Sequence, residues 1–233
     1  MAARAEIPEI RWSQAFEEVC RTFGIPSLLP EQEQAIRAFF RGKVFVNLPT
    51  GYGKSLIYQC LPMVADSIFG KPRGSSLILV ISPLKSLMED QVAYLNSIGV
   101  PAIVLGDSDD PEIFQQVLNG CYVVVFSSPE CLLITSKWRG MFSSCDDFKD
   151  MMIGVAIDEA HCITQWYVSL GQLNFMFRYR YFQPLRFFCK VGIFFQSKPV
   201  YDGSSGGLHI VSEKTIFIII TPKTIFPVPV CKF

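Results

Sequence analysis

The sequence predicts an α/β fold in which a parallel β-sheet is covered by helices on both faces. Short apolar runs alternate along the chain with segments of helical periodicity. The runs are almost continuously apolar, which is typical of strands buried on both faces of a sheet. A glycine-containing turn follows the first run and two adjacent acids follow the last, at the strand ends where parallel sheets bind ligands.

The expected elements follow one another in a regular order. After an amphipathic segment at 13–24, Pro30 begins a helix with an acidic first turn, and Gly42 lies where its C-terminal cap belongs. Pro62 is expected to kink or break the next helix. Beyond Trp166 the alternation is lost. The expected strands are 43–48, 76–82, 102–106, 121–127 and 151–157, and the later helices are 55–70, 83–99 and 110–120.

Composition excludes several classes of protein. Half of the residues are hydrophobic, but no run approaches the roughly 18–20 apolar residues of a membrane span. Charges occupy the N-terminal positions where a signal peptide is apolar, so we expect an intracellular protein without a membrane partner. The eight cysteines include no CxxC pair, and there are only two histidines. These features argue against a disulfide framework and a zinc site.

The net charge of zero conceals a division near residue 167. Residues 1–167 contain 13 Lys and Arg against 19 Asp and Glu, whereas residues 168–233 contain 8 against 2. Arginines and aromatic residues cluster after the division, as in FRYRYFQPLRFFCK (177–190). This tail is interpreted either as a stacking surface for single-stranded nucleic acid or as an unrelated sequence translated after the Trp166 codon, and we favour the second interpretation.

A candidate phosphate-binding loop follows the first strand, in NLPTGYGKSLIYQ (47–59). Backbone amides from about Gly51 to Ser55 are expected to face a polyphosphate at the positive end of a helix, with Thr50, Tyr52 and Gly53 in the turn. Lys54 would reach the β and γ phosphates, and the Ser55 hydroxyl would ligate Mg²⁺. Leu48 replaces the first glycine of the strict motif, so a turn with a solvated lysine is the alternative.

Two adjacent acids follow the strand at 151–157. Asp158 is expected to hold Mg²⁺, directly or through water, and Glu159 to polarise the attacking water. Such a pair is also common at helix N-termini. A phosphate loop about a hundred residues upstream in the same strand–helix pattern favours the catalytic interpretation.

The order of five segments resembles the first RecA-like domain of RecQ-family DNA helicases, in superfamily 2. The segments are LLPEQEQAI (28–36), NLPTGYGKSLIYQ, ISPLKSLMEDQV (81–92), SSPE (127–130) and AIDEAHCITQW (156–166). The resemblance implies a P-loop, RecA-like fold for residues 20–167, with an N-terminal segment at 1–19 and a divergent tail at 168–233. It also implies ATP and Mg²⁺ as cofactors.

The resemblance further implies roles for individual residues. Gln32 would recognise the adenine edge, and His161 would couple the nucleotide site to DNA. The residues expected along single-stranded DNA or in its coupling to ATP are Ser82, Lys85, Gln91, Ser128, Gln165 and Trp166. For Lys85 and Gln91, an exposed helix face without such a role is the alternative.

The family pattern stops at Tyr167. A strand ending in a Thr-Ala-Thr-like motif, a second RecA-like lobe with its arginine finger and a zinc-binding region are not recognisable after Trp166. The missing strand would leave a gap between the P-loop strand and the DEAH strand, with exposed edges. The segment KTIFIIITP (214–222) is a candidate to fill that gap, although one apolar strand is common by chance.

The resemblance implies a 3′ to 5′ DNA helicase that binds single-stranded or forked DNA, in the nucleus or, in a prokaryote, the nucleoid or cytoplasm, with DNA-repair proteins as partners. We expect this chain, as a truncated form, not to unwind DNA alone. One alternative is a non-catalytic isoform or gene-model fragment that binds ATP or DNA. A second is an RNA-directed ATPase of superfamily 2, against which the extension CITQW (162–166) argues.

Overall fold

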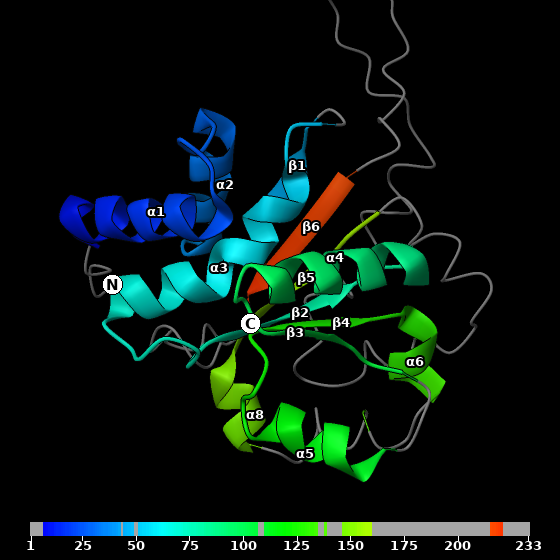
Figure 1. Cartoon of the computed structure of the whole chain (residues 1–233). Coiled ribbons are helices and arrows are strands. Elements are labelled where there is room, and N and C mark those ends of the chain that lie inside the picture. The colour runs from blue at the N-terminus through cyan, green and yellow to red at the C-terminus, as the bar shows by residue number, and fades with distance from the viewer. Residues whose placement is uncertain are drawn as a thin grey trace, which may run out of the picture.

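A six-stranded sheet forms the centre of the protein, with the strand order β1-β6-β5-β2-β4-β3 (Figure 1). The computed structural model describes residues 7–42, 44–48, 51–106, 110–134, 138, 146–159 and 215–220. The strands are β1 (Val44–Asn47), β2 (Leu77–Ile81), β3 (Ala102–Val104), β4 (Val124–Ser127), β5 (Met152–Ile157) and β6 (Thr215–Ile220).

Four neighbouring strands form the parallel part of the sheet. β2 pairs in parallel with both β4 and β5, and β4 pairs in parallel with β3. Every residue of β2, β4 and β5 is buried, which explains why their sequences are continuously apolar rather than alternating. The predicted α/β class with a parallel sheet is confirmed for these strands.

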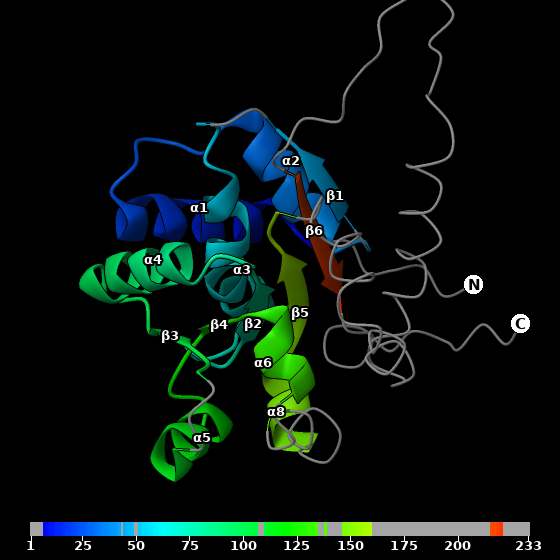
Figure 2. The same cartoon turned by 90° about the vertical axis from the view of Figure 1, so that its right-hand side faces the viewer.

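The sixth strand comes from the divergent tail. β6 lies between β1 and β5 in both views (Figure 2) and pairs antiparallel with each of them. β6, residues 215–220 of the candidate segment, therefore fills the expected gap, and the edges of β1 and β5 that face it are paired, while β1 is the outermost strand of the described sheet. The sheet is consequently mixed at this strand rather than wholly parallel. Antiparallel pairing needs no crossover helix of fixed hand, so a strand that arrives from a distant part of the chain can occupy the slot.

Helices cover both faces of the sheet, as predicted (Figure 1). Alternate residues of β2 belong to two separate cores, because successive side chains of a strand point to opposite faces. The helices on one face are α1 (Glu9–Phe23), α2 (Pro30–Phe39), α3 (Lys54–Phe69) and α4 (Lys85–Ser97); those on the other are α5 (Pro111–Leu118), α6 (Pro129–Ile134) and α8 (Asp146–Met151).

Helix α3 is the central helix of its face, and it differs from the sequence prediction. Pro62 lies inside α3, yet the helix continues to Phe69, so the expected break does not occur. Most of the helix is buried, and packing on several sides offsets the backbone hydrogen bond that proline cannot make. None of the described helices is long and apolar enough to cross a membrane.

Two further boundaries differ from expectation. Helix α1 begins at Glu9 and packs against α3, with Trp12 and Phe16 in the shared core. The boundary expected at residue 19 therefore falls inside α1. Helix α2 ends at Phe39, and the Gly42 amide donates to the Ala38 carbonyl at 3.1 Å. Gly42 thus follows the helix end instead of capping it directly.

Candidate nucleotide and DNA site

The candidate phosphate loop connects β1 to α3 at the carboxyl end of the sheet. Gly51 and Gly53 have φ angles of 88° and 63°, the left-handed region that glycine adopts without strain. Helix α3 begins at Lys54, so Lys54 and Ser55 form its first turn and the backbone amides there face outward from the helix N-terminus. The Lys54 ammonium donates to the Leu48 carbonyl at 2.6 Å. Thr50 lies outside the described residues.

Gln32, the residue expected at the adenine edge, forms hydrogen bonds to the candidate phosphate loop. Its side chain is buried; Nε2 donates to the Tyr52 carbonyl at 3.0 Å and to the Gly53 carbonyl at 3.3 Å. Its Oε1 accepts a hydrogen bond from the Leu29 amide at 2.9 Å. Both ends of the amide are therefore engaged by backbone groups, which ties the start of α2 to the loop.

The acid pair lies at the carboxyl end of β5, beside β2. Asp158 is buried, and its backbone amide donates to the Ile81 carbonyl at 2.9 Å. Glu159 has a φ of 52°, the only positive φ of a residue other than glycine among those described. Its amide donates to Asp158 Oδ1 at 3.0 Å. A strained backbone at the residue expected to orient water is typical of functional sites.

Tyr58 connects α3, which carries Ser55, to Asp158, the other residue that the sequence proposes as a magnesium ligand. Its hydroxyl lies 3.1 Å from Asp158 Oδ2 and 2.7 Å from Gln91 Oε1. Burial, reinforced by the Asp158 charge, raises the pKa of Tyr58 well above its usual value. The hydroxyl therefore remains protonated and able to donate a hydrogen bond.

Sequence reasoning missed Tyr58 and its neighbour Gln59, whose Nε2 donates to Gln91 Oε1 at 2.9 Å. All three side chains are buried. A signal was present, because two consecutive polar side chains interrupt the apolar middle of the helix, and buried polar groups need partners. The partners themselves lie 32 to 100 positions away along the chain.

The residues expected along DNA differ in exposure. Lys85 begins α4 with its side chain 78% exposed, 4.0 Å from Glu89. Gln91 faces inward, so the exposed helix face considered as its alternative is wrong. Ser82 follows β2 and is buried, and its hydroxyl has no hydrogen-bond partner among the described residues. The Ser128 hydroxyl accepts from the Cys131 amide at 3.1 Å, at the start of α6.

Three residues of the expected coupling segment, His161, Gln165 and Trp166, lie outside the described residues. No group of three or more His, Cys, Asp or Glu side chains arranged for metal binding occurs in the described part of the chain. Magnesium does not require such a group, because it keeps several waters and takes one or two carboxylates together with substrate phosphates. Ser55 on α3 and Asp158, which is bonded to Tyr58 of the same helix, fit that pattern.

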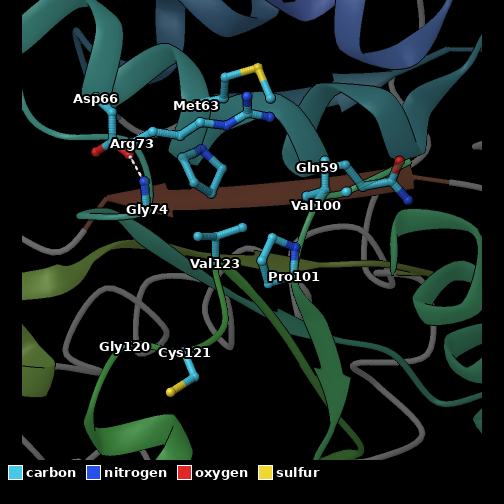
Figure 3. Close-up of a pocket in the computed structure, with 12 residues that line it drawn as sticks. Gln59, Met63, Asp66, Arg73, Gly74, Val100, Pro101, Gly120, Cys121 and Val123 are labelled. Atoms are coloured by element: carbon cyan, nitrogen blue, oxygen red, sulfur yellow. Dashed lines mark hydrogen bonds between the residues drawn. The ribbon is translucent and has the colours of Figure 1, made fainter. Parts of the chain in front are cut away.

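A separate pocket of about 250 Å³ lies at the opposite, amino-terminal end of the strands (Figure 3). Its lining includes Gln59 and Asp66 of α3 together with Arg73, which precedes β2. Asp66 Oδ2 accepts from the Gly74 amide at 2.8 Å, and burial raises the pKa of this carboxyl. Asp66 therefore anchors the turn between α3 and β2.

Comparison with known proteins gives one consistent family. Residues 29–181 match the DEAD/DEAH box helicase family, a range that runs past Trp166, where the recognisable motifs end. The chain is 34% identical over 173 residues to the ATP-dependent helicase SGS1 of Saccharomyces cerevisiae, covering 71% of this chain and 12% of that protein. It is 38% identical over 167 residues to the ATP-dependent DNA helicase RecQ of Haemophilus influenzae, covering 66% and 25%.

A solved structure agrees on the fold. The DUF1998 helicase MrfA, in a crystal structure bound to DNA and AMPPNP, superposes with a TM-score of 0.53 at 21% identity, covering 67% of this chain and 22% of that one. The chain spans about an eighth to a quarter of the length of the curated relatives described above. The loop before α3, the acids after β5 and the family match over more than half of the sequence together show that this chain belongs to the DEAD/DEAH box helicase family.

Proposed function

We propose that this chain is the ATP-binding domain of a RecQ-type DNA helicase, which binds ATP with Mg²⁺ and engages single-stranded DNA. The observation that carries the proposal is the 3.1 Å hydrogen bond to Asp158 Oδ2, after β5, from the hydroxyl of Tyr58 on α3, the helix that begins with Lys54 and Ser55. Two motifs a hundred residues apart thereby meet at the carboxyl edge of the sheet, where a nucleotide would contact both.

The residues divide the chemistry of phosphoryl transfer among them. Amides at the start of α3 and the Lys54 ammonium would bind the phosphates. Ser55 and Asp158 would hold Mg²⁺, which supplies charge compensation for the phosphate oxygens when it is bound. Glu159 would accept a hydrogen bond from the attacking water and orient it towards the terminal phosphate. Such catalysis consists mainly of positioning and charge stabilisation, which preformed side chains can supply.

Single-stranded DNA is proposed to lie along the same edge of the sheet, near the start of α4. The exposed Lys85 side chain supports this placement, because a lysine neutralises a phosphate without reading sequence. Names of similar proteins, such as the DNA helicase RecQ, favour DNA over RNA. A nuclear location and DNA-repair partners belong to the same proposal.

Substitution of Lys54 tests the nucleotide site directly. Lys54→Ala is expected to weaken binding of a fluorescent ATP analogue at least tenfold, because the phosphates lose their positive partner. Lys71→Ala, beyond the other end of α3, is the charge-matched control and should bind like the unmodified chain. Fluorescence titration measures both, and equal affinity of the two variants would refute the nucleotide site.

Glu159→Gln separates catalysis from binding. It is expected to keep nucleotide affinity and to abolish the slow hydrolysis that we expect of the unmodified chain in a phosphate-release assay. If neither form hydrolyses ATP while both bind it, the chain is a non-catalytic binding module. Stimulation of hydrolysis by RNA in preference to DNA would favour the RNA-directed alternative.

A further inference from the structure

The Tyr58 hydroxyl lies between two acceptors that belong to different parts of the candidate site. One is Asp158 Oδ2 at the end of β5, and the other is Gln91 Oε1 in the middle of α4. Tyr58 is completely buried, and its ring packs edge-on against Phe126, with the centroids 6.4 Å apart. The position of the hydroxyl oxygen is therefore fixed, and only its hydrogen can turn.

A tyrosine hydroxyl has one hydrogen and cannot donate to both acceptors at once. The two acceptors therefore compete for it. Gln91 Oε1 also accepts from Gln59 Nε2, so it keeps one hydrogen bond to α3 when the hydroxyl turns away. The ionised Asp158 carboxylate is the stronger acceptor of the two, because hydrogen bonds to ionised groups are about twice as strong as neutral ones.

A divalent cation bound to Asp158 would compensate the negative charge of the carboxylate and make it a weaker hydrogen-bond acceptor. The hydroxyl would then donate to Gln91 and strengthen the attachment of α4 to α3. Without the cation the hydroxyl would donate to Asp158, and Gln91 would keep only its hydrogen bond from Gln59. Met88 and Leu95 pack the same face of α4 into the core, so the helix stays attached. The change affects only how tightly α4 is held against α3, which we call its seating.

We propose that Tyr58 is a positioning residue that couples divalent-cation occupancy of Asp158 to the seating of helix α4 through Gln91. This inference rests on the proposed function, because it takes Asp158 as the magnesium ligand. It adds a physical route from the nucleotide edge to the helix whose first residue, Lys85, is exposed for nucleic acid. The two ends of such a route must influence each other reciprocally in binding.

Tyr58→Phe in the 233-residue chain tests the route, because it removes the hydroxyl and keeps the ring. The magnesium concentration needed for half-maximal binding of AMPPNP should fall about three- to tenfold, because the cation no longer has to displace the hydroxyl from Asp158. Hydrogen–deuterium exchange is the second measurement. Magnesium and AMPPNP should slow exchange in 85–97 of the unmodified chain and have no such effect in Tyr58→Phe.

Gln91→Met is the matched variant on the other side of the hydroxyl. It removes the α4 acceptor and keeps a side chain of similar length. We expect it to abolish the exchange response of α4 and to raise the magnesium requirement, because the hydroxyl loses the acceptor to which it turns when the cation binds. Tyr94→Phe, on the exposed face of α4, is the control and should behave like the unmodified chain in both measurements.

The possible failures are distinguishable. If the unmodified chain binds no AMPPNP, the proposed function fails and the coupling fails with it. If AMPPNP binds and α4 responds to magnesium equally in the unmodified chain and in Tyr58→Phe, only the coupling is overturned. If Tyr58→Phe does not fold, Gln91→Met decides, because an exchange response that survives this substitution also overturns the coupling.

Discussion

At the scale of single residues, the contact between Gln32 and Gly53 shows how closely the Gln32 side chain packs against the candidate phosphate loop. A Cβ at Gly53 would lie 2.7 Å from Gln32 Nε2, whereas a Cβ at Gly51 would meet no described atom within 4 Å. Both glycines have positive φ. A substitution at either glycine therefore strains the backbone, whereas only a substitution at Gly53 also brings a Cβ against Gln32.

Alanine at each glycine separates these two effects. Gly51→Ala should lower the free energy of unfolding by about 1–2 kcal/mol, the cost of a left-handed backbone for a residue with a Cβ. Gly53→Ala should lower it further, because Gln32 must also give up its hydrogen bonds to the loop, at about 1 kcal/mol each. Urea unfolding measures both variants. Equal losses would show that Gln32 does not support the loop.

At the scale of secondary-structure elements, β6 is the strand on which the completeness of the sheet depends. Ile218 is paired with Val44 of β1 on one side and with Ala156 of β5 on the other. A strand with neighbours on both sides uses its backbone donors and acceptors in two ladders, so it tolerates proline poorly. Losing β6 would expose the edges of β1 and β5, which invites association between chains.

Proline at position 218 tests this strand. Ile218→Pro should lower the free energy of unfolding by several kcal/mol, because it removes a backbone donor and disturbs both ladders. It should also increase aggregation in light scattering. Ile218→Val keeps the backbone amide and the β-branched side chain, and it should change stability by at most about 1.5 kcal/mol. A proline variant as stable and as monomeric as the valine variant would contradict the placement of β6.

At the scale of the whole molecule, the described residues form one sheet with a core on each face. The family resemblance implies a second lobe that supplies an arginine across the nucleotide cleft. Such an arginine is typically worth about 10³–10⁵ in rate. A domain that lacks this group should bind nucleotide and turn it over slowly.

We therefore expect the purified 233-residue chain to show no strand separation on forked DNA in a fluorescence unwinding assay. DNA-stimulated hydrolysis should stay near background for the same reason, and Lys54→Ala should remove what remains. A full-length RecQ helicase in the same assay is the positive control. Robust, ATP-dependent unwinding by the chain alone would contradict this expectation.

Much of the fold was predictable because it depends on local patterns. Hydrophobic periodicity gave the order of strands and helices, and residues such as Gly53, Lys54, Asp158 and Glu159 belong to short motifs whose geometry is set by neighbours in the chain. Pro62 shows the limit of such patterns, because burial of α3 overrides the local preference of proline against a helix.

The sequence by itself determined the class of fold, the glycine-containing turn before α3 and the strand that ends in two acids. Tertiary structure decided where β6 inserts, that Gln91 faces inward, and that Tyr58 joins Asp158 to α4. These contacts connect positions 33 to more than 150 residues apart. Periodicity and spacing describe a residue's neighbours along the chain, whereas such contacts depend on how the whole chain packs.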